Sequence, residues 1–368
     1  MTELTDDQNK ILKEVSSARK TIKTDDYSMS IGELINLYSE NEIKLDPAFQ
    51  RLFRWDNHQR TKLIESILIG IPIPEIFVAQ KSDGTWHVVD GVQRLSTIFQ
   101  LVGKLSGEEG LTLTTCKYIP SLEGKSWTDL PVSTQREFKK SKIKVNIILT
   151  ENSDEAQYEL FQRLNTGGTS LSPQEVRNCL MLMVDPGFYE KINKLKNYGN
   201  FKDCLKIKDH MFEKEFHMEL ILRMYIGYQG IVEYGKYKPI TSVLFSDFID
   251  KETINLIKNS DVEKFEMVFK KTFDKIKNGL KEKAFHKYDE ERADFIGAFN
   301  VSAFEMISSG IASNIGTIEH ISDEKLRKKI ELIYAEDDVK KFLGRGKKAL
   351  VRFKGLTEYA KGYFSEDV

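Results

Sequence analysis

Apolar residues in the first half of the chain alternate between strand-like and helix-like spacing. Residues 58–70 place apolar side chains on one helical face and end in glycine, which predicts a helix. Residues 71–80 and 86–90 are rich in apolar and β-branched residues, and the Asp83-Gly84 pair between them favours a tight turn, so we expect a β-hairpin. Residues 95–102 return to helical spacing directly after the second strand.

Capping signals and one further apolar run extend this alternation. A hydroxyl or amide side chain with an acid three positions later predicts that helices start after Ser30, Asn152 and Ser172. Residues 144–150 predict another strand, and the glycine-bearing residues 165–172 predict a loop. Strands and helices interleaved in this way indicate a compact α+β domain.

The pattern changes beyond about Asp185. Residues 215–228, 263–276 and 291–311 each show the spacing of an amphipathic helix, so the second half is expected to be all-helical. The first residues of the chain are polar, with a short helical pattern at most. The predicted organisation is therefore α+β, with a polar segment over residues 1–27, an α+β domain over 28–185 and an all-helical domain over 186–368.

Composition narrows the functional classes. The 368 residues carry a net charge of −1, so no overall basic field points to nucleic acid, and such contact would have to be local or made with a partner. Cys116, Cys179 and Cys204 are scattered, which fits a reducing cytosol, and Cys179 lies on an apolar helix face typical of a core. With no apolar leader and no run of membrane-spanning length, we expect a cytoplasmic protein and no membrane contact.

The pentapeptide Asp90-Gly91-Val92-Gln93-Arg94 lies at the predicted strand-to-helix junction. A helix start has unpaired N–H groups and a positive dipole end, which suits an anion. Gly91 permits close approach of a ligand, Arg94 can bind phosphate oxygens, Gln93 can orient water or a base, and Asp90 can bind a metal or act as a base. The alternative is a plain turn in which Asp90 caps the helix and Arg94 pairs with a surface acid.

Two further clusters carry the same kinds of side chain. Residues 46–55 combine arginines, an amide and aromatic rings that suit stacking and phosphate contact, or else form a buried aromatic plug. Residues 161–169 end a helix in a glycine-rich turn that suits an anion nest or an ordinary C-cap, and Arg177-Asn178 lies on a side of the next helix that could face this loop. Their candidate ligand-binding residues are Gln50, Arg51, Arg163, Asn165, Thr166, Gly167 and Gly168.

These motifs together resemble the ParB/sulfiredoxin-like family built around a D-G-Q-Q-R motif, catalogued as domain of unknown function 262, which includes the N-terminal part of GmrSD-type enzymes. The resemblance rests on DPAFQRLFRW, LIESILIGIPIP, VVDGVQRLSTI and FQRLNTGGTSLSPQEVRN, in this order, over residues 28–182. It implies a small nucleotide-binding fold that hydrolyses an NTP with Mg²⁺ in bacterial defence against modified phage DNA. Carried over, Asp90, Gly91, Gln93 and Arg94 match the signature, and Asp90 is the expected metal ligand.

The chain departs from this family pattern in two places. Val92 stands where the family usually has its first Gln, which puts hydrolysis more in doubt than binding. Many relatives also carry an HNH nuclease half, which needs clustered histidines around a metal. Here the six histidines are dispersed, and the nearest approach, residues 286–289, is expected to be a solvated loop.

A basic segment near the C-terminus suggests a contact with DNA. Residues 342–354 formally contain G-x-G-x-x-A but follow a helical stretch, so a Rossmann fingerprint is rejected, and no P-loop motif occurs in the chain. A flexible loop could touch a DNA backbone, although a solvated loop is the simpler interpretation. The residues concerned are Arg345, Lys347, Lys348 and Arg352.

Three functional hypotheses remain open at this point. The leading one is an NTP-binding, NTP-hydrolysing protein of an anti-phage or modified-DNA restriction system, acting with a partner nuclease or as a homo-oligomer. The second is a metal-dependent DNA endonuclease or nickase that uses Asp90 itself. The third is a non-enzymatic, nucleotide-gated DNA-binding module.

Overall fold

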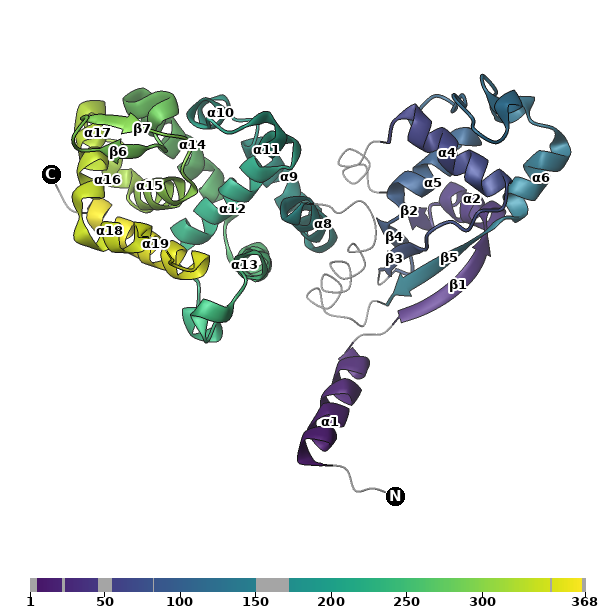
Figure 1. The fold of residues 1–368 in the computed structure, drawn as a ribbon, viewed down its shortest axis with the longest axis horizontal. Coiled ribbons are helices and arrows are strands. Elements are labelled where there is room, and N and C mark those ends of the chain that lie inside the picture. Colours follow the sequence, from purple (N-terminus) through teal and green to yellow (C-terminus); the bar gives the residue numbers. More distant parts are fainter. Residues whose placement is uncertain are drawn as a thin grey trace. The chain divides into compact units, whose positions relative to one another are not determined.

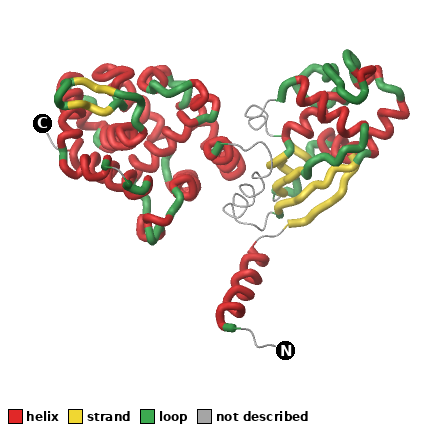
Figure 2. Tube along the Cα trace, viewed as in Figure 1, coloured by secondary structure: helices red, strands yellow, loops and turns green. Residues whose placement is uncertain are grey.

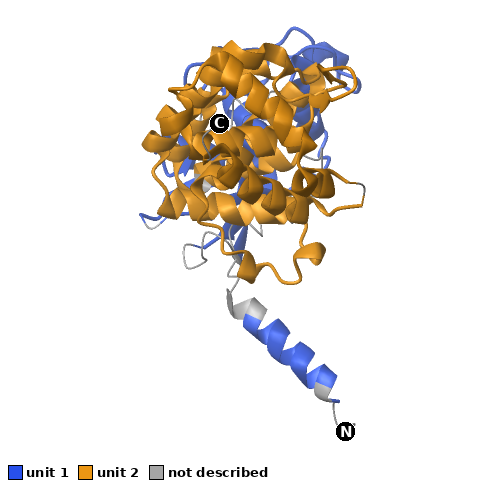
Figure 3. Cartoon of the chain, turned by 90° about the vertical axis from the view of Figure 1, so that its left-hand side faces the viewer, with its two compact units in different colours: residues 1–170 blue, residues 171–368 orange. Residues whose placement is uncertain are grey.

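A computed structural model describes residues 5–21, 24–45, 55–81, 83–149, 172–344 and 346–365. The chain divides into two compact units, residues 1–170 and residues 171–368, which Figure 3 colours blue and orange. Each unit buries apolar residues of its own, so each has a separate hydrophobic core.

The first unit combines a five-stranded sheet with helices (Figure 1). Strand β2 is a short piece of two residues, whereas β1 and β5 are the longest strands. The elements are α1 Asp6–Thr21, β1 Thr24–Ser30, α2 Ile31–Ser39, β2 Ile43–Lys44, α4 Asn57–Leu68, β3 Ile76–Gln80, β4 Trp86–Asp90, α5 Val92–Leu101, α6 Val132–Lys140 and β5 Lys142–Ile148.

The sheet of this unit is mixed. Its strand order is β1-β5-β3-β4-β2, with β1/β5 and β3/β4 antiparallel and β5/β3 and β4/β2 parallel. The ladder between β3 and β4 has an irregularity between Phe77 and Val78, next to the pairing of Phe77 with Asp90. The end of β4 is therefore a bulged, distorted position, which is common beside functional sites.

The core of the first unit lies between the sheet and helices α2, α4, α5 and α6, which Figure 1 shows gathered along it. Strand residues Ile76, Val78 and Val145 and helix residues Leu95 and Ile98 have no more than 1% of their surface exposed. Burial of such side chains contributes about 1.5–3 kcal/mol each. This packing holds the β4–α5 connection against the rest of the unit.

The second unit is helical, with one short hairpin (Figure 2). Helix α15 is buried nearly all round and packs against α12, α14 and α19. The elements are α8 Pro173–Val184, α9 Pro186–Leu195, α10 Gly199–Cys204, α11 Asp209–Glu213, α12 Phe216–Gln229, α13 Phe245–Asn259, α14 Val262–Leu280, β6 Lys287–Asp289, β7 Asp294–Ile296, α15 Val301–Ser313, α16 Ile315–Ile318, α17 Asp323–Leu332, α18 Asp337–Leu343 and α19 Ala349–Ser365.

The predicted α+β class and most of the predicted elements are confirmed. The hairpin β3–β4 forms, and β4 leads into α5 through a single glycine. Ser30 and Ser172 cap α2 and α8 by accepting the N–H of the residue three positions on, and Ser172 forms the full capping box with Glu175. The helix predicted over residues 152–164 lies outside the described residues.

The structure differs from the sequence prediction in three elements. The polar segment 1–27 contains helix α1 and most of strand β1, because backbone pairing with β5 recruits a strand whose side chains are mostly polar. Strand β5 begins at Lys142 and ends at Ile148, whereas it was predicted over residues 144–150. The second half is helical as predicted, but β6 and β7 form a hairpin within it. Residues 287–289 supply the first strand of this hairpin, so the solvated loop predicted over residues 286–289 was wrong.

The boundary between the compact units also differs from the predicted one. The units divide after residue 170, whereas the sequence pattern placed the change at residue 185. Helix α8 packs against α9 and α13 and therefore groups with the helical unit. Among the described residues, no helix has the combination of length and apolar character that crossing a bilayer requires.

Candidate functional site

The β4–α5 junction is built around a glycine in a conformation that other residues rarely adopt. Gly91 has φ +96° and occupies the N-cap of α5 without any side-chain capping bond. A Cβ atom there would lie 2.9 Å from Cγ1 of Ile76, so the position is closed to larger residues by both strain and contact. Asp90 does not cap α5, and the plain-turn alternative is therefore wrong on this point.

Arg94 ties this junction together. Its Nη2 atom donates to Oδ2 of Asp90 at 2.7 Å and to the carbonyl oxygen of Glu75 at 3.0 Å. The Arg94 side chain is 15% exposed and the Asp90 side chain 40% exposed. The arginine therefore pairs with the acid of its own motif, not with a separate surface acid, and it links the start of β3, the end of β4 and the first turn of α5.

One nitrogen of the Arg94 guanidinium has no acceptor among the described residues. This nitrogen is Nε, and it is buried. A buried guanidinium N–H without an acceptor is costly, so an anionic oxygen would be stabilised there. A Cβ added to Gly91 would lie 3.2 Å from Nη2 of Arg94, which places the guanidinium directly beside the bare backbone of Gly91.

The other two residues of the motif, Val92 and Gln93, contact other parts of the protein. Val92 is 5% exposed and packs in the core at the start of α5. Gln93 accepts a hydrogen bond on Oε1 from the backbone N–H of Trp55 at 3.0 Å. The amide oxygen of Gln93 thus fixes the segment just before α4. Position 92 faces the core, so an amide at this position would not be placed to orient a water molecule at the ligand.

Asp90 is the one carboxylate that the motif offers to a metal ion. One of its oxygens is taken by Arg94, and among the described residues no three His, Cys, Asp or Glu side chains are grouped closely enough to hold a metal alone. Mg²⁺ is commonly held by one or two carboxylates together with substrate phosphates. The partly exposed Asp90 therefore fits a metal that arrives with a phosphate ligand and does not fit a metal held by protein side chains only.

A buried carboxylate elsewhere in the motif region is structural. Glu65 on α4 is 5% exposed and accepts the backbone N–H groups of Lys117, Tyr118 and Ile119. Burial favours its neutral form, but these three hydrogen bonds outweigh burial and lower its pKa below the ordinary value. Glu65 thereby anchors the loop after α5 onto α4 and has no free oxygen to offer a ligand.

The predicted site is brought together only in part. Asp90, Gly91 and Arg94 are adjacent in space, and Gln93 lies on the same first turn of α5 as Arg94. The remaining candidates lie outside the described residues, so their contribution stays a prediction: Gln50, Arg51, Arg163, Asn165, Thr166, Gly167, Gly168 and Arg345.

Arg177 lies in the interior of the second unit. It is fully buried in the second unit, where its Nε donates to Oδ1 of Asp250 at 2.7 Å and its Nη1 contacts Glu219 at 3.4 Å. Asn178 is buried as well and accepts from Gln174 at 2.7 Å. Ion pairing across helices of the second unit holds the arginine inside, and the loop that Arg177-Asn178 was expected to face lies outside the described residues, so that expectation stays a prediction.

The basic segment near the C-terminus is not one continuous loop. Lys347 and Lys348 are exposed in the link before α19, but Arg352 and Lys354 lie on α19 itself. Lys354 Nζ lies 5.0 Å from the ring centroid of Tyr234, and Arg352 is half-buried. Among the described residues of this segment, only Lys347 and Lys348 lie exposed in a link between helices, as the prediction of a flexible basic loop requires.

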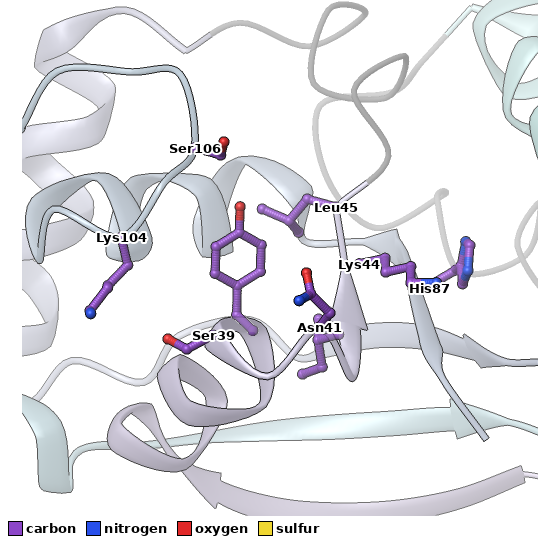
Figure 4. Close-up of a pocket in the computed structure, with 9 residues that line it drawn as sticks. Ser39, Asn41, Lys44, Leu45, His87, Lys104 and Ser106 are labelled. Atoms are coloured by element: carbon purple, nitrogen blue, oxygen red, sulfur yellow. The ribbon is translucent and has the colours of Figure 1, made fainter. Parts of the chain in front are cut away.

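A surface hollow that sequence reasoning missed lies at the other end of β4 (Figure 4). It has a volume of about 540 Å³ and is lined by residues from the end of α2, from β2, from the start of β4 and from the turn after α5. Its polar lining residues are Ser39, Asn41, Lys44, His87, Lys104 and Ser106. These residues are spread over separate segments and form no local motif, so no sequence pattern marks them.

Comparison with known families identifies the first part of the chain. Residues 31–182 match the family described as the GmrSD restriction endonuclease, N-terminal domain. The match begins at the first residue of α2 and ends within α8, and it confirms the resemblance drawn from the four sequence motifs. Comparisons with curated proteins and with solved structures gave no significant match.

Proposed function

Because residues 31–182 carry an N-terminal domain of the GmrSD restriction endonuclease family, we propose that this domain binds a nucleoside triphosphate with Mg²⁺ and serves the restriction of modified phage DNA. The binding site is the β4–Gly91–α5 junction. Nucleotide binding is the biochemical step, and DNA restriction is the process in which the chain takes part together with a nuclease.

One observation carries this proposal. The side chain of Arg94 is held beside the backbone of Gly91 at the start of α5, with its buried Nε lacking an acceptor among the described residues. A helix start offers N–H groups and a positive dipole end, and a guanidinium adds a full charge and directional donors. Phosphate oxygens are the ligands that such an arrangement favours.

Asp90 has two roles in the proposal. It orients Arg94 through the 2.7 Å ion pair, and its second oxygen is left to face the metal that accompanies the phosphates. When bound, Mg²⁺ would neutralise phosphate charge. Hydrolysis by the isolated chain is expected to be slow, since Gln93 uses its amide oxygen to hold the backbone of Trp55.

Calorimetric titration with each of the four common nucleoside triphosphates and Mg²⁺ tests the proposal. Arg94→Gln should weaken binding about tenfold or more, because a charge-assisted hydrogen bond to a buried group contributes about 1.5–3 kcal/mol. Arg60→Gln is the matched control, since Arg60 is also a half-buried helix arginine, bonded to Gln100 at 2.9 Å. Binding that is equal in Arg94→Gln and wild type would remove the site from this junction.

Phosphate release measured with and without modified DNA tests the second half of the proposal. Turnover is expected to rise when DNA that carries bulky base modifications is present and to stay low with unmodified DNA. Efficient Mg²⁺-dependent cleavage of plasmid by the chain alone, abolished by Asp90→Ala, would instead favour a nuclease that uses the same motif.

A further inference from the structure

The hollow at the end of α2 has the chemistry of an anion site. Among the described residues, its polar lining consists of two lysines, one histidine, two serines and one asparagine, with no carboxylate. Its volume of about 540 Å³ lies in the ~300–1,000 Å³ range of small-ligand sites. A cavity of this size with cations and hydroxyls but no acid selects a phosphorylated ligand.

The cations lie at both ends of the hollow. Lys44 and His87 are Cα partners in the parallel pairing of β2 with β4, so their side chains emerge next to each other. Lys104 and Ser106 come from the turn after α5, and Figure 4 shows them on the opposite side of the hollow from Lys44 and His87. A ligand that fills the hollow would meet a cation at each end.

The middle of the hollow is apolar and rigid. Ile43 and Leu45 line it and are 1% and 7% exposed, and the ring of Tyr38 also lines it. That ring is stacked on Phe99, with the centroids 4.2 Å apart and the planes at 15°. A fixed aromatic ring beside aliphatic side chains is a surface on which a base or a sugar can pack at little entropic cost.

Hydrogen bonds already occupy the carbonyl groups at the end of α2, next to the hollow. The last carbonyl groups of α2 already accept bonds, from Ser39 Oγ to Ile35 O and from the N–H groups of residues 40–42 to the carbonyls of residues 36–38. The Asp83 carboxylate accepts hydrogen bonds from the backbone N–H and the hydroxyl of Thr85, and Lys44 also attracts it electrostatically. Among the described residues, neither Lys44 nor Lys104 forms a salt bridge.

We propose that this hollow binds one nucleotide of a single-stranded nucleic acid, with its base or sugar against Tyr38 and its two flanking phosphates at Lys44 and Lys104. A nucleotide inside a strand has a phosphate on each side, which matches cations at both ends better than a free mononucleotide does. The inference does not depend on nucleotide binding at Asp90–Arg94, because it rests on different residues at the opposite end of β4.

The test is the salt dependence of binding of a short labelled oligo(dT) to the full chain, followed by fluorescence anisotropy. Lys44→Gln/Lys104→Gln should weaken binding about tenfold and lower the slope of log K against log salt by about 1.4, since each phosphate contact on a single strand contributes about 0.7. Lys62→Gln/Lys140→Gln removes two exposed lysines of the same unit that do not line the hollow, and it should leave both quantities unchanged.

Substitution of the ring separates stacking from simple charge attraction. Tyr38→Phe keeps the stack on Phe99 and should bind like wild type, whereas Tyr38→Leu should bind several-fold more weakly with the salt slope unchanged; melting curves verify that each variant folds. A nucleoside 3′,5′-bisphosphate should displace the oligonucleotide better than the 5′-monophosphate, and oligo(U) in place of oligo(dT) identifies which kind of strand is the ligand. Lack of binding to both strands, or equal loss in the two double-lysine variants, would overturn the proposal.

Discussion

Nη2 of Arg94 lies 2.7 Å from Oδ2 of Asp90, one helical turn earlier in the chain. The two charged groups of the motif therefore hold each other, and the carbonyl of Glu75 holds the same nitrogen at 3.0 Å. This arrangement positions the guanidinium beside Gly91 before any ligand arrives. A preorganised group loses less entropy on binding, so the pair is consistent with a role in ligand binding as well as in the fold.

Asp90→Asn should leave the fold nearly intact and weaken binding that depends on Mg²⁺. The carboxylate is 40% exposed, and an ion pair with this degree of exposure contributes less than about 1 kcal/mol. Calorimetry with and without Mg²⁺ measures the binding, and thermal melting measures the stability of the fold. Asp26→Asn, which removes an exposed acid 3.6 Å from Lys144, is the control and should affect neither. A large fall in melting temperature for Asp90→Asn alone would assign Asp90 to structure.

Gly91→Ala should destabilise the first unit more than Gly84→Ala. Both glycines have positive φ, +96° and +85°, so alanine at either position costs about 1–2 kcal/mol of backbone strain. At Gly84 a Cβ would meet nothing within 4 Å, whereas at Gly91 it would lie 2.9 Å from Ile76, which adds about 1–3 kcal/mol of overpacking. Denaturant unfolding of the two variants measures the difference. Equal losses of stability in the two variants would show that the Ile76 side chain moves aside at no cost.

Val92→Gln should lower stability without raising turnover. Val92 is 5% exposed, and burying an unpaired amide there costs about 1–3 kcal/mol. The matched control is Val132→Gln, because Val132 is likewise the first residue of its helix but is 61% exposed, so its substitution should change stability by less than about 0.5 kcal/mol. Faster phosphate release by Val92→Gln with an unchanged melting temperature would show that an amide at this position reaches the ligand.

His217 should make the second unit less stable as the pH falls. Burial lowers its pKa from 6.5 to about 4, with Lys196 and Lys202 acting in the same direction. Glu215 lies 3.8 Å away, but Lys196 is bonded to it at 2.9 Å. Between about pH 6.5 and about pH 4 the unfolded chain binds more protons than the folded chain, so stability is lost as the pH falls through this window.

The size of this effect is on the order of 1–2 kcal/mol between about pH 7 and about pH 5. Denaturant unfolding at several pH values should show it in wild type and show a flatter profile in His217→Phe. His320→Gln is the control, since His320 has a side chain 78% exposed and its removal should leave the profile unchanged. An identical profile in His217→Phe and wild type would contradict the assignment to His217.

Local elements were predictable from the sequence because their causes are local. The capping box at Ser172 and Glu175 and the hairpin turn at Gly84 each act over a few residues, and the structure has them where the sequence predicted them. The junction at Gly91 was predictable for the same reason, since a strand pattern meets a helix pattern at a glycine. The family resemblance then added an expected chemistry to that junction.

Features that depend on partners distant in sequence were not predictable in this way. Strand β1 has mostly polar side chains and exists because its backbone pairs with β5, more than a hundred residues later. Arg177 was predicted to lie on a side of its helix that could face the preceding loop. It is fully buried, because Asp250 and Glu219 approach it from two other helices. Neither acid is marked as its partner by any local spacing.

For this protein, the sequence by itself determined the α+β and helical halves, the helix starts and the Asp90–Arg94 junction, because periodicity, capping and turn chemistry operate within one or two turns of chain. Only the tertiary structure decided that Arg94 pairs with Asp90, that Val92 lies in the core and that Lys44, His87 and Lys104 share one hollow. These outcomes follow from sheet order and from packing between segments that are far apart in the chain, and burial and long-range pairing are settled only when the whole core closes.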